Sequence, residues 1–260
     1  MDSVILDIDD GVATVGLNRP DRGNALDLPT LKAVHAAADH LGAMRDVRVV
    51  LLRSLGPIFC AGGDLRWMAA QDDQRLAVHA LATELHAALL ALRALDAPVV
   101  AVVQGAAAGA GVSLAISADI ALAAESATFT MAYTNVGLSP DGGSTWLLPR
   151  LIGPQRASAL MLLNTTVTAS EAAQLGLVAR VVADDQLDAE AARAADRLRR
   201  GPRAAHAAVK RLIAASAGSP LSEQLEREAV TIAELAAGPE GREGIEAFLS
   251  GRRPDFHAAS

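Results

Sequence analysis

The chain has one cysteine, few aromatic side chains and no excess of positive charge. Cys60 is the one cysteine among 260 residues, so an intrachain disulfide is excluded and a reducing compartment suits the protein. Phe, Trp and Tyr together make up 3% of the residues, which predicts an aliphatic core. The formal net charge is −7, and no basic patch is interleaved with aromatic residues, which argues against nucleic-acid binding.

Long apolar runs are also missing from the sequence. The longest candidates are interrupted by Asp96, Pro98 and Gln104 before they reach the roughly 20 residues that a bilayer requires. The chain begins MDSVILDIDD, without the basic segment of a secretory signal. The six histidines show no metal-ligand spacing with acidic residues. We therefore expect a cytoplasmic protein that binds neither a membrane nor a metal.

What is present is a globular composition, with 51% hydrophobic and 20% charged residues. Val4 to Ile8 and Val12 to Leu17 flank Asp9-Asp10-Gly11, a pattern typical of a hairpin. Further strand patterns alternate with helical ones, which predicts an α/β fold with parallel pairing. The expected strands are Val47 to Leu52, Pro98 to Val103, Ile120 to Ala123 and Thr128 to Met131, with helices after Asp27 and over Asp72 to Leu95.

Helical patterns dominate from about residue 142 onward, except for a strand pattern at Val178 to Val182. Gly-Pro pairs separate several of these helices, as at Gly153-Pro154 and Gly201-Pro202. We predict an α/β core over residues 1–200 and an all-helical region over residues 201–260.

Two glycine-rich loops follow predicted strands. FCAGGDL (Phe59 to Leu65) comes after Val47 to Leu52, and QGAAAGAGV (Gln104 to Val112) comes after Pro98 to Val103. If the two strands are parallel neighbours, both loops lie at the carboxyl edge of the sheet, where α/β folds bind ligands. One backbone N–H from each loop can then converge on one oxygen. Such an oxyanion hole stabilises an enolate or a tetrahedral intermediate.

Other interpretations of the second loop are weaker. Small residues there also let a helix pack closely on a sheet. A dinucleotide-binding loop needs three glycines, but Gly109, Gly111 and Leu114 supply two, and the Walker A lysine is absent. Gly111-Val112-Ser113-Leu114-Ala115 is similar to the nucleophile elbow of serine hydrolases, which also needs a downstream histidine. His206 and His257 lie in a helical pattern and near the terminus, so we disfavour a hydrolase.

The ordered motifs resemble those of the enoyl-CoA hydratase/isomerase, or crotonase, superfamily. They are NRPDRGNAL (Asn18 to Leu26), FCAGGDL, QGAAAGAGVSL (Gln104 to Leu114), GLSPDGGSTWLLPRLIG (Gly137 to Gly153) and the ending FLSGRRPDF (Phe248 to Phe256). The resemblance implies a β-β-α spiral core with a C-terminal helical trimerisation region. It also implies an acyl-CoA thioester substrate, no cofactor beyond the CoA of that substrate, and a homotrimer or dimer of trimers.

The resemblance assigns the oxyanion-hole N–H groups to Gly63 and Ala110. Arg22 is expected near the CoA phosphates, with a solvated loop charge as the alternative, and Arg252 and Arg253 are weaker candidates for the same phosphates. Asp64 is a candidate contact, although a cap on the helix after it is the more favoured role. Other expected substrate or CoA contacts are Ala25, Ala61, Leu65, Trp67, Gly109, Ser113 and Tyr133. Trp67, Met68, Tyr133 and Trp146 are candidates for the acyl pocket, with a core or interface role as the alternative, and Cys60 is expected to be a small buried residue.

The expected reaction depends on one acidic residue. Hydratases of this superfamily use two glutamates, but Ser113 and Tyr133 stand at the corresponding positions of this chain. Asp141 remains, as in similar isomerases, including those resembling the ring-epoxide isomerases of phenylacetate breakdown. One carboxylate suffices to move a proton from C2 to C4 while an oxyanion hole holds the dienolate. Asp141 could instead cap the helix that begins near Gly142.

We therefore expect an acyl-CoA isomerase that moves a double bond or rearranges a ring epoxide, with Asp141 as its acid/base. An enoyl-CoA hydratase of fatty-acid β-oxidation that uses a differently placed water is the first alternative. A non-catalytic acyl-CoA binding protein is the second.

Overall fold

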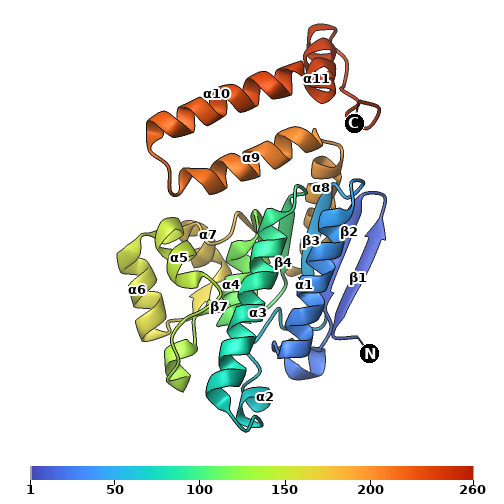
Figure 1. The fold of residues 1–260 in the computed structure, drawn as a ribbon. Coiled ribbons are helices and arrows are strands. Elements are labelled where there is room, and N and C mark those ends of the chain that lie inside the picture. Colours follow the sequence, from blue (N-terminus) through green and yellow to red (C-terminus); the bar gives the residue numbers. More distant parts are fainter. Residues whose placement is uncertain (1, 260) are drawn as a thin grey trace.

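A six-stranded sheet lies at the centre of the computed structural model, which describes residues 2–259 (Figure 1). Its strand order is β1-β2-β3-β4-β6-β9. The first two strands form the expected antiparallel hairpin, and the other neighbours pair in parallel. The strands are β1 (Val4–Asp9), β2 (Val12–Leu17), β3 (Val49–Ser54), β4 (Val99–Val103), β6 (Ile120–Ala124) and β9 (Arg180–Val182). The predicted α/β fold with parallel pairing is confirmed.

Helices cover both faces of this sheet because successive strand side chains point to opposite sides. Val50 and Leu52 of β3 belong to the larger core, beneath α1 (Leu28–Ala43), α3 (Gln74–Ala94) and α4 (Ala110–Ser117). Val49 and Leu51 face the other way and pack against α8 (Leu187–Arg199). A strand buried on both faces explains the continuous apolar run in the sequence.

Aspartates start three of the first helices. Asp27 accepts a hydrogen bond from Thr30 N–H at 2.9 Å and caps α1, as the sequence predicts. Asp73 caps α3 in the same way. By length and composition alone α3 could cross a membrane, but core helices of soluble proteins pass the same test, and its buried leucines lie in the larger core.

A second, three-stranded sheet was not predicted. It contains β5 (Ala107–Ala108), β7 (Thr128–Thr130) and β8 (Val167–Thr168). Two-residue strands are too short to produce a periodic pattern, so nothing in the sequence separates β5 from the glycine loop around it. The remaining elements before α8 are the short helices η1 (Pro20–Arg22), η2 (Tyr133–Val136) and η3 (Asp184–Gln186), together with α2 (Leu65–Ala69), α5 (Ser144–Ile152), α6 (Pro154–Leu163) and α7 (Ala169–Leu175).

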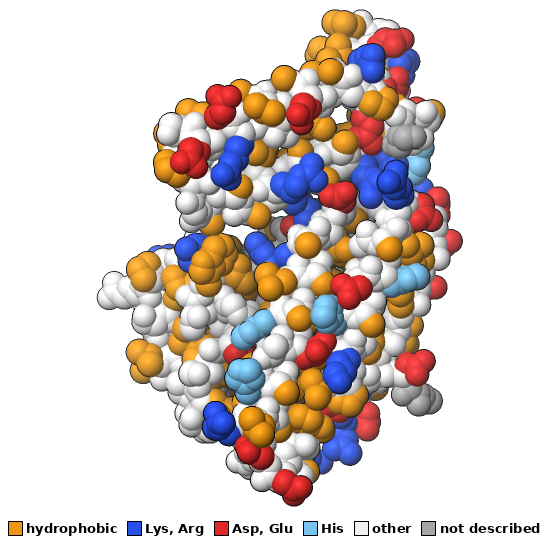
Figure 2. Space-filling view, viewed as in Figure 1, with side chains coloured by type: hydrophobic (Ala, Val, Ile, Leu, Met, Phe, Trp, Pro, Cys, Tyr) orange, Lys and Arg blue, Asp and Glu red, His pale blue; other side chains and the backbone are white. Residues whose placement is uncertain are grey.

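The last three helices extend away from the α/β body (Figure 1). They are α9 (Arg203–Ser216), α10 (Leu221–Ala237) and α11 (Pro239–Leu249), so the expected helical region is confirmed. Glu240 of α11 accepts hydrogen bonds from the N–H groups of Arg203 and Ala204 at 3.0 and 2.8 Å, which ties α11 to the start of α9. Hydrophobic side chains are exposed along α9 and α10 (Figure 2).

Candidate active site

The two glycine loops lie side by side and are hydrogen-bonded to each other. β3 and β4, which lead into them, are parallel neighbours. The Cys60 N–H donates to Ala106 O at 3.2 Å, and the Ala108 N–H donates to Cys60 O at 2.8 Å. The predicted meeting of the loops at the carboxyl edge of the sheet is therefore confirmed.

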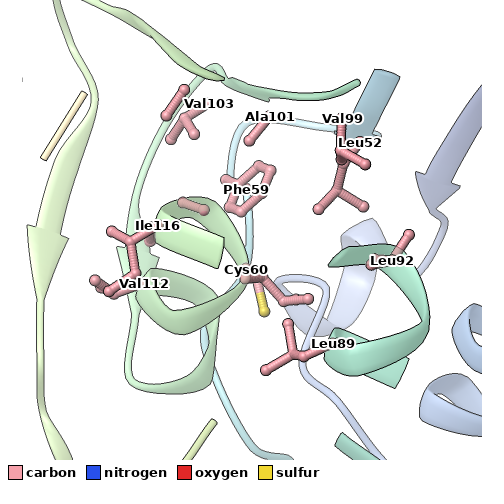
Figure 3. Packing of buried hydrophobic residues seen from close by; sticks show 14 of the residues in the cluster. Leu52, Phe59, Cys60, Leu89, Leu92, Val99, Ala101, Val103, Val112 and Ile116 are labelled. Atoms are coloured by element: carbon pink, nitrogen blue, oxygen red, sulfur yellow. The ribbon is translucent and has the colours of Figure 1, made fainter. Parts of the chain in front are cut away.

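Small residues allow the close approach of the two loops. A Cβ atom on Gly111 of α4 would lie 2.3 Å from Cys60 O, far inside ordinary contact distance. Gly62 has φ +93°, and a Cβ there would lie 2.8 Å from Ala108 O. Figure 3 shows Phe59 and Cys60 beside Val112 and Ile116 of α4 within the core. Gly62 and Gly111, one from each motif, are thus required by packing between backbones.

The backbone N–H groups of Gly63 and Ala110 are available as donors. Within residues 2–259 neither of them donates a hydrogen bond to another backbone group. Ala110 is the first residue of α4, so its N–H has no partner inside the helix and lies at the positive end of the helix dipole. Gly63 and Ala110 both line the same cavity.

This cavity has a volume of about 270 Å³ and a mostly apolar wall. Val78, Leu81, Ala82 and Leu85 of α3 form one side of it. Among the residues predicted from the sequence, those on its wall are Ala61, Gly63, Leu65, Gly109, Ala110, Tyr133 and Asp141, together with the acyl-pocket candidate Met68. Arg22, Ala25, Asp64, Trp67 and Ser113 are not on the wall. The four α3 residues on the wall were not predicted from the sequence, because their helical spacing is equally typical of residues that face the core.

Asp141 lies on the cavity wall. Its Oδ1 accepts a hydrogen bond from the Tyr133 hydroxyl at 2.6 Å. Its backbone carbonyl accepts bonds from Ser144 N–H at 3.1 Å and from Ser113 Oγ at 3.2 Å. Gly143 is the N-cap of α5, and no side chain caps that helix. The alternative role of Asp141 as a helix cap is therefore wrong, and its carboxylate bonds to the Tyr133 hydroxyl instead of to the start of α5.

Tyr133 stays protonated at neutral pH. Its burial, the charge of Asp141 and the hydrogen bond to that carboxylate raise the pKa of Tyr133 above the ordinary value of 10.0. Its ring also lies near the backbone of Gly109, which has φ +52°. Tyr133 is consequently a hydrogen-bond donor at the cavity wall.

Arg19 connects the NRPDRGNAL segment to the first glycine loop, a role that sequence reasoning did not find. Its Nη2 lies 3.0 Å from both Asp27 Oδ2 and Asp64 Oδ2. Burial by itself would raise the pKa of Asp64, but hydrogen bonds from Trp67 N–H and Arg19 hold that pKa below its usual value. Asp64 therefore caps α2 and pairs with Arg19, which agrees with the favoured capping role.

Asn24 completes the same connection and was also missed. It is 1% exposed, and its side chain bonds to Arg19 N–H, Leu55 O and Ile58 O. Nothing in the sequence separates Arg19 or Asn24 from the polar residues around them, because the partners that tie them to the first glycine loop and its approach, Asp64 for Arg19 and Leu55 and Ile58 for Asn24, lie far along the chain.

The other candidate residues lie apart from the cavity wall. The Arg22 side chain is 47% exposed, and the ion pair found for it is with the adjacent Asp21. Arg252 pairs with Glu243 at 2.6 Å. Burial raises the pKa of the Cys60 thiol to about 12, so Cys60 is an unreactive core residue at neutral pH. Within the described residues, no three His, Cys, Asp or Glu side chains are grouped to hold a metal ion.

Two residues whose backbone N–H groups have no backbone partner lie on the wall of this apolar cavity, together with one carboxylate among the described lining residues. Such a set of groups can hold the oxygen of a carbonyl compound while negative charge develops on it. A family model described as enoyl-CoA hydratase/isomerase matches residues 7–259. The chain belongs to the enoyl-CoA hydratase/isomerase family. Its fold is accordingly the crotonase fold that the sequence motifs predict.

Individual relatives carry the names of different reactions. A Rhodobacter capsulatus protein named "Probable enoyl-CoA hydratase" is 40% identical over 96% of both chains. The 1,2-epoxyphenylacetyl-CoA isomerase of Escherichia coli is 34% identical over 98% of both chains. The crystal structure of an enoyl-CoA hydratase from Mycobacterium smegmatis superimposes with a TM-score of 0.93 at 35% identity, covering 98% of this chain and 99% of the other.

Proposed function

We propose that the protein is an acyl-CoA isomerase that moves a double bond through a thioester enolate, with Asp141 as the acid/base. The observation that carries this proposal is the composition of the cavity wall. Asp141 is the one carboxylate among the described lining residues, and Gly63 and Ala110 lie on the same wall with their N–H groups available. Water addition ordinarily needs a second acid/base group, whereas moving a double bond needs one.

In the proposed mechanism the thioester oxygen accepts hydrogen bonds from Gly63 N–H and Ala110 N–H. The Asp141 carboxylate removes a proton from C2 of a 3-enoyl thioester. The C–H electron pair moves into the conjugated system, and negative charge collects on the oxygen held by the two N–H groups. Asp141 then returns the proton to C4, which leaves the double bond between C2 and C3 and restores the carboxylate.

The test is turnover of 3-enoyl-CoA and 2-enoyl-CoA by the wild type and by Asp141→Asn. The asparagine keeps the side-chain size but cannot accept the proton, so we expect isomerisation to fall by a factor of about 100 or more. Asp73→Asn, which alters an exposed cap of α3, is the matched control and should keep full activity. Isomerisation unaffected by Asp141→Asn would overturn the proposal.

The same assay separates the two alternative functions. The R. capsulatus relative carries the name of a hydratase, so brisk hydration of 2-enoyl-CoA with little isomerisation would assign that reaction instead. Binding of acyl-CoA without turnover of either substrate would assign the non-catalytic alternative.

We also propose that the protein assembles as a homotrimer or dimer of trimers through its C-terminal helices. Exposed apolar side chains on α9 and α10 support this, among them Ile213, at 66%, and Ile232, at 69% exposed. Covering such surface is favourable by about 25 cal/mol per Å². Sedimentation analysis should give a trimer or hexamer for the wild type and smaller species for Ile213→Asp with Ile232→Asp.

A further inference from the structure

The Tyr133 hydroxyl is held against the proposed acid/base. It donates to Asp141 Oδ1 at 2.6 Å, within the range of a short charge-assisted hydrogen bond. The Ser113 hydroxyl donates to the backbone carbonyl of Asp141 at 3.2 Å. Side chains of α4 and η2 thus both hydrogen-bond to Asp141, in the turn before α5, and the three residues form one network.

The backbone around this network is arranged to hold the phenol in place. Ala132, the residue before Tyr133, has φ +58°, a left-handed conformation that residues with a Cβ atom disfavour. Strained backbone of this kind is concentrated at functional sites. The residue after Asp141 is also packed closely, since a Cβ atom on Gly142 would lie 2.7 Å from Ser113 Cβ.

The position of the phenol limits what Asp141 can do. A carboxylate that activates water must accept a proton from it within hydrogen-bond distance. The phenol takes one acceptor site of Oδ1, and no described residue donates a hydrogen bond to Oδ2, so Oδ2 is the oxygen best placed to take a proton from C2 and return it to C4. Adding water needs, in addition, an acceptor for the proton that leaves the water.

From this geometry we infer that Tyr133 is a positioning residue that orients Asp141 and closes one of its oxygens to water, so that the site favours proton transfer between carbons over hydration. This inference rests on the proposed function. Tyr133 is then the residue that selects between isomerisation and hydration.

The test compares Tyr133→Phe with the wild type on 3-enoyl-CoA and on 2-enoyl-CoA. The phenylalanine keeps the ring and removes the hydroxyl. We expect kcat for isomerisation to fall about tenfold with KM changed less than about twofold, and the ratio of isomerisation to hydration to fall by at least about tenfold. Thr134→Ala is the matched control, because it removes the hydroxyl of the next residue of η2, which donates to Met161 O and lies off the cavity wall. Its ratio should stay near that of the wild type.

An unchanged ratio in folded Tyr133→Phe would overturn the inference, and so would an equal change in Thr134→Ala. If Tyr133→Phe does not fold, substrate labelled with deuterium at C2 decides the question with the wild-type protein. A shielded oxygen should carry most of the label to C4, whereas complete loss of the label to water contradicts the inference. Loss of isomerisation in Asp141→Asn together with an unchanged ratio in Tyr133→Phe would leave the proposed function standing and remove only this inference.

Discussion

Gly111→Ala is the substitution that best tests the proposed oxyanion hole of Gly63 and Ala110. The new methyl group would lie 2.3 Å from Cys60 O and 2.8 Å from Cys60 Cβ, whereas ordinary contacts begin near 3.4 Å. The start of α4 must therefore move by about 1 Å away from the first glycine loop. Gly111 lies inside a helix, where alanine would otherwise be favoured by about 1 kcal/mol, so any loss of stability is due to the collision.

The expected consequences are a modest loss of stability and a large loss of rate. Overpacking of this kind costs about 1–3 kcal/mol in the free energy of unfolding. A displacement of about 1 Å at a reacting centre lowers the rate by about 100-fold, comparable to losing one oxyanion donor. The assays are thermal unfolding and turnover of 3-enoyl-CoA, with binding of acyl-CoA measured separately.

Gly42→Ala in α1 is the matched control for this substitution. Its methyl group would meet only Leu95 Cδ2, at 3.6 Å, so we expect unchanged turnover and a stability gain of up to about 1 kcal/mol. Gly111→Ala with wild-type turnover and wild-type stability would show that α4 and the first glycine loop are not in close contact.

Four further outcomes follow from the same structure. Gly62 has φ +93°, and a Cβ there would lie 2.8 Å from a backbone oxygen, so Gly62→Ala should lower the free energy of unfolding by about 1–3 kcal/mol in thermal unfolding. Gly63→Ala should lower it much less, because the new methyl group would meet only the flexible end of the Met68 side chain. Equal losses in the two variants would contradict this expectation. The Cys60 thiol, with its pKa raised to about 12, should react with a disulfide reagent only after denaturation, and a fast native reaction would show that it is exposed. The folded state raises the pKa of Tyr133 above 10.0, so unfolded chains lose the phenol proton at a lower pH than folded ones. The stability that the phenol contributes, measured by urea unfolding as the difference between wild type and Tyr133→Phe, should therefore shrink as the pH rises above about 10. A difference that stays constant with pH would refute this expectation. Arg19→Ala leaves the buried Asp64 carboxylate without its cation and should cost about 2 kcal/mol in urea unfolding, and a loss below about 0.5 kcal/mol would show that the pair is merely a surface one.

Much of this fold could be predicted because its strands and helices differ in period. Residues 49–52 of β3 are buried on both sides of the sheet and therefore form a continuous apolar run, and α3 shows its leucines at helical spacing. Parallel pairing of the two strands then places both glycine loops at one edge, with no further information. The two-residue strand β5 could not be predicted, since it is too short for a sequence pattern and is defined only by its pairing with β7 in the folded chain.

The site was less predictable because its contacts depend on conformations that the residue types do not indicate. Ala132 adopts a left-handed conformation, and alanine gives no sign of one in the sequence. That turn is what brings Tyr133 back to Asp141, eight residues further on. Arg19 and Arg22 look alike as loop charges, yet only Arg19 reaches the buried Asp64.

The two departures at Ser113 and Tyr133 are physically coupled. Ser113 is fully buried, and a Cβ atom on Gly142, in the turn after Asp141, would lie 2.7 Å from Ser113 Cβ. This close packing leaves little room for a longer side chain at residue 113, and the Ser113 hydroxyl instead donates to the Asp141 carbonyl oxygen. The Tyr133 phenol donates to the Asp141 carboxylate and so fixes its orientation without adding a second negative charge. Asp141 is therefore the one carboxylate among the described residues of the cavity wall, and the proposed isomerisation depends on it alone.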